Sequence, residues 1–149
     1  MTPAERIGVF ATQFSEARLS PEIRALSARS LLDTYAVGVA GRNELPSQRA
    51  LQYLATLGPS QDATLWGLAQ RASAESAALY NGITAHVLDY DDVTSPLRGH
   101  PSVVLWPALV ALGEREALPM ERMLSAFAVG FEVMCKLAKA FATEHYAKG

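Results

Sequence analysis

The chain has 149 residues, half of them hydrophobic, which is enough for one domain with a core and too few for two comfortable ones. Its 13 basic and 15 acidic residues give a net charge of -2 without a basic block, so we expect no nucleic acid partner. The single cysteine, Cys135, excludes an internal disulfide and any multi-cysteine metal site built from this chain alone. Because the start does not read as a signal peptide and no apolar run reaches the roughly 18 residues of a membrane span, we expect a soluble, cytoplasmic protein.

The first third of the chain carries two helix signals. Thr2, Pro3 and Glu5 occupy the positions of a capping residue, a first helical residue and a capping-box partner, which predicts a short amphipathic helix there. A serine–proline pair then opens an apolar segment at 23–40, which predicts a central helix that stops at Gly41.

The middle of the chain adds two further helices. Residues 46–57 predict one that is closed by a glycine–proline pair, and the brief alternation in 63–67 predicts a short extended piece without a sheet. Small, helix-tolerant residues over 72–87 predict a helix that approaches its neighbours closely. Within it, Asn81-Gly82 indicates either a break or a close helix contact.

The last third begins with a polar, acidic segment at 88–99, which predicts a loop. Pro101 then sits where the first residue of a helix belongs. Residues 103–111 of that helix are strongly apolar, and Pro107 predicts a kink in it. Pro119 opens a final helix with an apolar stripe at helical spacing. The expected fold class is therefore all-α, a bundle of about six helices over the whole chain.

The chemically informative stretch is 86–102, where three aspartates, an arginine and two histidines occur between two apolar helices. If Pro101 begins a helix, the free backbone N–H groups of its first turn offer a place for a substrate carboxylate, with His100 beside it. The helix end favours the neutral form of that imidazole and the nearby aspartates favour its charged form. Such a side chain suits general acid or base catalysis.

Simpler interpretations stand beside this one. Asp91 and Asp92 are expected to be ordinary solvated loop residues, whereas Asp89 is expected to be partly buried and to need a partner. His86 is expected to be a satisfied core or interface histidine, and Arg98 pairs either with the aspartates or with a substrate carboxylate. A divalent metal on the aspartates stays an alternative, although their spacing matches no calcium loop and we predict none.

An ordered series of short motifs runs through nearly the whole chain: Leu32-Asp33-Thr34, Thr64-Leu65-Trp66-Gly67, Ala78-Leu79-Tyr80-Asn81-Gly82, His86-Val87-Leu88-Asp89-Tyr90-Asp91-Asp92, Gly99-His100-Pro101-Ser102 and Gly130-Phe131-Glu132-Val133. Together they resemble the MmgE/PrpD family, which includes 2-methylcitrate dehydratase, cis-aconitate decarboxylase and iminodisuccinate epimerase. The resemblance implies a helical first domain, a smaller α/β second domain and a homodimer. It also implies lyase or isomerase chemistry on small di- and tricarboxylates without a cofactor.

The resemblance assigns roles to individual residues. Asp89 and His100 match active-site residues of relatives and are the predicted catalytic pair, Asp89 orienting or tuning a base and His100 transferring a proton or binding developing charge. Thr94, Arg98 and Ser102 are the predicted substrate ligands. In relatives a threonine commonly follows the aspartate run directly, whereas here a valine takes that place and Thr94 comes one residue later.

The competing interpretation is a non-catalytic helical module for dimerisation or partner binding. His145-Tyr146 and Gly149 resemble the start of a His-Tyr-x-x-Gly motif that in relatives leads into a further active-site histidine. The family's catalytic lysine and second domain are not in this sequence either. We therefore expect a fragment, residues 1–149 of the helical domain, that is inactive by itself.

Overall fold

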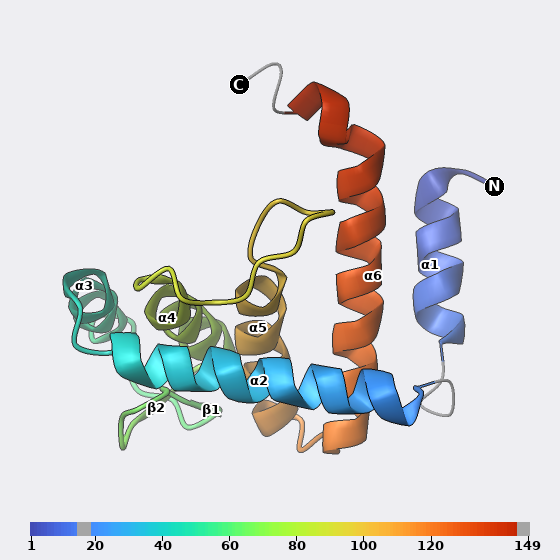
Figure 1. Ribbon diagram of the computed structural model, residues 1–149. Helices are drawn as coiled ribbons and strands as arrows, with labels where there is room; N and C mark the ends of the chain where they lie inside the picture. Colours follow the sequence, from blue (N-terminus) through green and yellow to red (C-terminus); the bar gives the residue numbers. More distant parts are fainter. Residues whose placement is uncertain (15–18, 146–149) are drawn as a thin grey trace.

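The computed structural model describes residues 1–14 and 19–145, so Tyr146 and Gly149 of the last motif lie outside it. The described residues form six α-helices and one very short hairpin, which confirms the predicted all-α class (Figure 1). No described helix is both long and apolar enough to cross a membrane. In chain order the elements are α1 (Pro3–Gln13), α2 (Pro21–Gly41), α3 (Leu45–Leu54), β1 (Ala63–Thr64), β2 (Arg71–Ala72), α4 (Ala74–His86), α5 (Pro101–Arg115) and α6 (Met120–His145).

Local capping explains where the early helices begin. At α1 the Thr2 hydroxyl accepts from the Glu5 N–H while the Glu5 carboxylate accepts from the Thr2 N–H, so the predicted capping box is present. At α2 the Ser20 hydroxyl accepts from the Ile23 N–H, and the helix runs to Gly41 as predicted. These starts depend on neighbouring residues only, which is why the sequence reveals them.

Two local predictions were wrong. The third helix ends at Leu54, because the N–H groups of Thr56 and Leu57 bond three residues back and close a turn in its place. A sheet does form: β1 pairs antiparallel with β2, with Ala63 opposite Ala72. Strands of two residues are too short to show a period in the sequence, and Gly67, at a φ of 77°, provides the turn between them.

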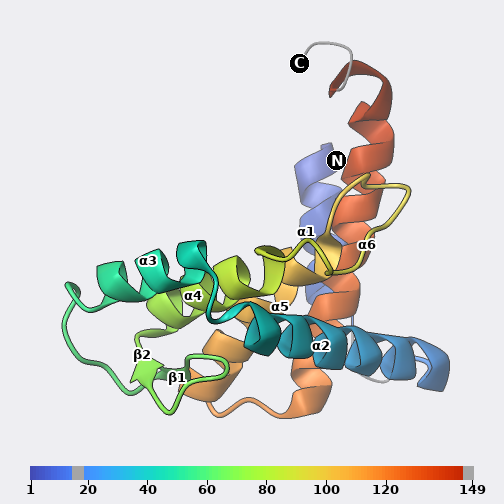
Figure 2. The same cartoon turned by 60° about the vertical axis from the view of Figure 1, so that its left-hand side comes forward.

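Helix α4 lies at the centre of the fold and packs against α2, α3 and α5. Helix α6 packs against α5 and α2 and runs across the direction of α2, with α1 beside it in both views (Figures 1 and 2). One core cluster joins α3, α4 and the hairpin. A second joins α5 and α6, where the rings of Trp106 and Phe127 stack with their centroids 4.4 Å apart.

Helix α4 continues through the Asn81-Gly82 pair, so the predicted alternative of a break does not occur, and a Cβ on Gly82 would lie 3.9 Å from Cγ of Pro107, an ordinary contact. Asn81 is fully buried; its Oδ1 accepts from the Trp66 N–H at 2.8 Å and its Nδ2 donates to the Thr64 carbonyl at 3.0 Å. A buried amide with both ends bonded fixes the hairpin on α4. Helix α5 likewise runs past Pro107 as one element, and a kink there stays a prediction.

Gly41 is expected to tolerate no side chain, because a Cβ there would overlap the Thr84 carbonyl oxygen and lie 2.6 Å from Cγ1 of Val87. Gly41→Ala should lower the free energy of unfolding in urea by about 1–3 kcal/mol through overpacking between α2 and α4. Gly8→Ala is the matched control, because nothing lies within 4 Å of that position, and it should leave stability unchanged or raise it by up to about 1 kcal/mol. Equal effects of the two changes would contradict this packing.

Candidate functional site

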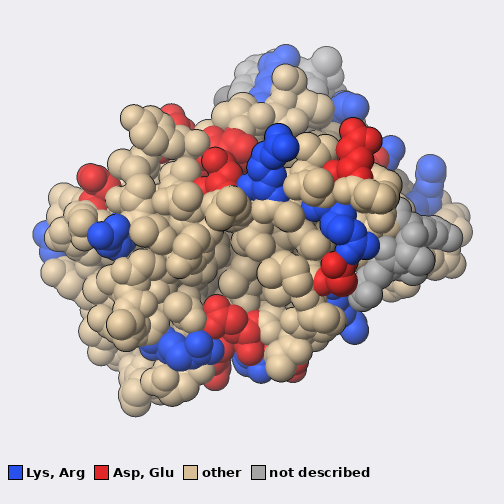
Figure 3. Space-filling model, turned by 60° about the horizontal axis from the view of Figure 1, so that its bottom comes forward, with Lys and Arg blue, Asp and Glu red and all other residues tan. Residues whose placement is uncertain are grey.

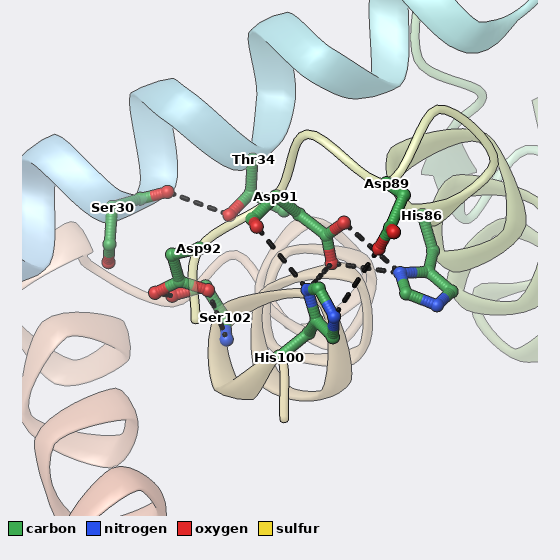
Figure 4. A network of polar contacts seen from close by, with 8 residues as sticks. All are labelled: Ser30, Thr34, His86, Asp89, Asp91, Asp92, His100 and Ser102. Carbon is green, nitrogen blue, oxygen red and sulfur yellow. Dashed lines mark hydrogen bonds and ion pairs between the residues drawn. The ribbon is translucent and has the colours of Figure 1, made fainter. Parts of the chain in front are cut away.

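Four side chains of the chemically informative stretch converge where α4 ends and α5 begins (Figure 4). His86 is the last residue of α4, Asp89 and Asp91 belong to the loop that follows, and His100 is the N-cap of α5. Each offers a nitrogen or oxygen atom, and these atoms lie within 4.8 Å of one another. We call these four residues the His–Asp cluster.

Asp91 is the centre of the His–Asp cluster. Its two carboxylate oxygens lie 3.1 and 3.0 Å from Nδ1 of His86, and Oδ2 lies 3.2 Å from Nδ1 of His100. Its side chain has no exposed surface, so the prediction of a solvated loop residue was wrong. A carboxylate is buried at acceptable cost only when donors surround it, and here the two imidazoles are close enough to supply them.

Asp89 has the opposite environment. Its side chain is 78% exposed, although partial burial was predicted, and its Oδ1 lies 3.4 Å from Nε2 of His100. The backbone explains the difference: Asp89 takes a φ of 55° in a turn where its N–H bonds the His86 carbonyl, and aspartate tolerates that conformation. The chain thus reverses at the end of α4 and leaves Asp89 outside.

His86 is the member of the cluster that the sequence prediction missed. It was expected to be a satisfied core or interface histidine, but its side chain is half exposed and faces Asp91, so the core assignment was wrong. Its ring lies edge-on to that of His100, with centroids 4.8 Å apart. A histidine in the last turn of a helix that leads directly into acidic residues is the signal that would have found it.

Asp92 turns the other way and fixes the start of α5. Its Oδ1 accepts from the Ser102 N–H at 3.1 Å and its Oδ2 accepts from the Ser102 hydroxyl at 2.6 Å. Ser102 is fully buried, and Asp92 is half-buried although it was predicted to be solvated. One first-turn N–H group that was expected to receive a substrate carboxylate is therefore already occupied, and a substrate contact from Ser102 stays a prediction.

The remaining predicted ligands lie in the loop that leads to His100. The Thr94 N–H donates to the Gly99 carbonyl at 3.1 Å, and the Arg98 N–H donates to the Thr94 carbonyl at 2.8 Å. Arg98 is exposed and takes a φ of 52°. These bonds close residues 94–99 into a small loop of their own, and the substrate contacts of Thr94 and Arg98 stay predictions.

On the opposite side of the loop, α2 presents hydroxyl groups (Figure 4). The hydroxyl of buried Thr34 donates to the Ser30 carbonyl at 2.7 Å, and the Ser30 hydroxyl accepts from Nε1 of Trp106 at 2.9 Å. One of these bonds lies within α2 and the other joins α5 to α2. The hydroxyl groups of α2 next to the aspartates are therefore already hydrogen-bonded within the fold.

The His–Asp cluster is also the one group among the described residues that combines the ligand types of a metal site. Two imidazoles and two carboxylates form a nitrogen and oxygen set that suits zinc or manganese. Our expectation is that no metal is needed, and this stays a prediction.

A groove of about 660 Å³ lies elsewhere, between α2, the end of α5 and the start of α6. The face in Figure 3 is largely uncharged and is hollowed near its middle, with charged side chains mostly around it. The carboxylate of the groove, Glu114, already accepts from the Thr64 N–H and hydroxyl and pairs with Arg71 at 3.0 Å. The carboxylate of this groove is therefore already engaged within the fold.

The surroundings of Cys135 do not favour a nucleophilic thiolate. It is buried on α6, and burial, together with the nearby Glu132 carboxylate, raises the pKa of its thiol. A neutral, enclosed thiol acts as a packing group, in keeping with its place among apolar helix positions.

Comparison with known proteins adds an independent line of evidence. The family model for sequences of the MmgE/PrpD N-terminal domain matches residues 5–148 of this chain. Cis-aconitate decarboxylase of Homo sapiens is 34% identical over 137 residues, which cover 87% of this chain and 27% of that protein. Cis-aconitate decarboxylase of Mus musculus is 35% identical over 118 residues, which cover 74% of this chain and 24% of that protein. The chain thus spans about a quarter of the length of the curated relatives it matches.

Asp92→Ala is expected to lower the free energy of unfolding by about 1–3 kcal/mol, because it leaves the buried N–H and hydroxyl of Ser102 without their acceptor. Urea unfolding measures the change. Asp33→Ala removes an exposed carboxylate from the middle of α2 and should shift stability by no more than about 0.5 kcal/mol. If the two variants were equally stable, the Asp92 cap would contribute nothing.

Proposed function

Because the chain belongs to the MmgE/PrpD family, we propose that its His–Asp cluster forms part of the active site of a lyase or isomerase for small di- or tricarboxylates. Dehydration, decarboxylation and epimerisation of such substrates all involve proton transfer or developing negative charge beside a carboxylate. The observation that carries the proposal is the place of His100, between a buried and an exposed carboxylate at the start of α5.

His100 is the proton-transfer group in this proposal. Nδ1 of its ring lies against buried Asp91, and Nε2 points toward exposed Asp89. The side chain keeps a quarter of its surface exposed, so a substrate can reach the ring. Asp89 lies beside the same nitrogen, where it is able to accept a hydrogen bond from the charged ring after proton uptake.

A substrate with several carboxylates needs positive charge near these aspartates. Arg98 supplies a guanidinium in the loop before His100, and we propose that it binds one substrate carboxylate, with Thr94 as a further contact. First-turn N–H groups of α5 add a positive field. A direct contact from Ser102 requires Asp92 to give up its two hydrogen bonds, so Ser102 is the weakest of the proposed ligands.

The rest of the proposal concerns the whole protein. This chain corresponds to the helical amino-terminal domain, 1–149, and a smaller α/β domain completes the enzyme. The complete protein is a cytoplasmic homodimer that uses no cofactor. These points rest on the resemblance to the family alone. The similarity to cis-aconitate decarboxylase, whose name describes the removal of carbon dioxide from a small polycarboxylate, supports only the proposed chemistry.

A second candidate function is a non-catalytic helical module for dimerisation or partner binding. The groove between α2, α5 and α6 favours it, because Leu32 is 68% exposed and Met120 is 48% exposed at its edge. This function predicts a mass that rises with concentration and no saturable binding of polycarboxylates.

The test is a titration of this chain with citrate and with cis-aconitate, in which binding is measured by calorimetry and by the NMR signals of the histidine rings. We expect saturable binding that His100→Ala and Arg98→Ala each weaken about tenfold or more, because each removes a charge-assisted contact. Arg29→Ala, which removes an exposed arginine of α2, is the matched control and should bind normally.

In the whole protein, His100→Ala should also lower turnover by about two or more orders of magnitude, as loss of a general acid or base does. Wild-type turnover in that variant would remove His100 from the chemistry. Absence of saturable binding, together with a concentration-dependent mass, would favour the second function.

A further inference from the structure

We propose that Asp91 is the positioning residue of the His–Asp cluster. It holds the ring of His100 with a proton on Nδ1, so that Nε2 is the atom that exchanges a proton with the substrate. The statement about the ring is independent of any reaction, whereas the statement about the substrate depends on the proposed function.

The first step of the argument concerns the groups around Nδ1 of His100. Oδ2 of Asp91 lies 3.2 Å from this nitrogen, and the backbone carbonyl oxygen of Asp91 lies 3.3 Å from it. A carbonyl oxygen has no proton to give, and an ionised carboxylate has none either. Both acceptors lie nearer to Nδ1 than the Asp89 carboxylate lies to Nε2, at 3.4 Å, so we infer that the neutral ring carries its proton on Nδ1 and its lone pair on Nε2.

The second step concerns burial. The side chain of Asp91 has no exposed surface, so water does not replace the imidazoles as donors to its oxygens. Nδ1 of His86 satisfies the same carboxylate from the other side, at 3.0 and 3.1 Å. One buried anion thereby fixes the rotation of two rings, and these lie edge to face.

The third step separates Asp91 from Asp89, to which the sequence assigned the orienting role. Asp89 lies on the Nε2 side of His100 at 3.4 Å and is 78% exposed, so it flanks the face that a substrate must approach. Asp91 lies on the buried side of His100, and its contacts with this ring are to Nδ1, the nitrogen that does not react in this proposal. The geometry therefore gives the orienting role to Asp91 and leaves Asp89 next to the reacting atom.

A purely structural role for Asp91, as a buried ion pair that holds the loop to α4, would also account for its burial. That role requires neither a particular tautomer of His100 nor a reactive nitrogen. The tautomer therefore distinguishes a positioning residue from a structural one, and NMR of nitrogen-labelled histidine reads it directly.

The experiment records the Nδ1 and Nε2 signals of His100 in this chain at alkaline pH, where imidazoles are neutral. The wild-type ring should show a protonated Nδ1 and a bare Nε2. Asp91→Asn removes the charged acceptor and leaves only the residue 91 carbonyl beside Nδ1, so the share of His100 that carries its proton on Nε2 should rise above the wild-type share. Asp89→Asn is the matched control and should leave the tautomer of His100 unchanged.

Two results would overturn the proposal: a wild-type His100 with its proton on Nε2, or the same tautomer populations of His100 in Asp91→Asn as in the wild type. If Asp91→Asn does not fold, the wild-type spectrum still decides, together with His86→Gln. His86 is half exposed, and its replacement should leave the proton of His100 on Nδ1. A shift to Nε2 in that variant would count against Asp91.

A kinetic measurement tests the link to the proposed function. In the whole protein, Asp91→Asn should lower kcat about tenfold or more while KM changes little, because substrate binding does not involve the buried carboxylate. If Asp91→Asn alters the tautomer of His100 but leaves kcat unchanged, the proposal that Asp91 contributes to catalysis is rejected, whereas the proposal that Asp91 positions the ring stands. Failure of the proposed function itself appears separately, as absence of polycarboxylate binding in the wild type.

Discussion

A carboxylate removed from water must be surrounded by donors, and this requirement at Asp91 organises the junction between α4 and α5. Asp92 meets the same requirement with different partners, the N–H and hydroxyl of Ser102. The two neighbouring side chains thus reach different groups, Asp91 the two imidazoles and Asp92 the backbone and hydroxyl of Ser102. One bonds the histidine at the end of α4 and the other bonds the first turn of α5, and together they join the two helices.

Close packing of α4 makes this junction possible. Ala77 and Ala85 are completely buried, and Gly41 brings α2 against the carbonyl of Thr84. Without large side chains between them, the backbones approach closely and Asn81 bonds the hairpin at the same time. The helix therefore delivers His86 to one defined place, from which the loop starts.

The sequence predicted those features that depend on neighbouring residues. Capping at Thr2 and Ser20 is local chemistry, and so is the helix start at Pro101; all three appear in the structure. The environments of Asp89 and Asp91 came out reversed, because burial in this loop is decided by a backbone turn at Asp89 and by rings that approach from two different helices. Composition contains no information about either, whereas the place of His86 in the last turn of a helix before acidic residues was a signal that the sequence prediction did not use.

The loop between the aspartate pair and His100 separates two fixed points. Asp91 and Asp92 are bound on one side of it and His100 and Ser102 on the other, whereas residues 94–99 close on themselves through the pairing of Thr94 with Gly99. An insertion within this small loop is expected to leave both sets of bonds in place, whereas one between Asp91 and Asp92 should separate the residue that contacts the histidines from the one that bonds Ser102. We therefore expect changes of length to be tolerated best within residues 94–99, between the two sets of bonds.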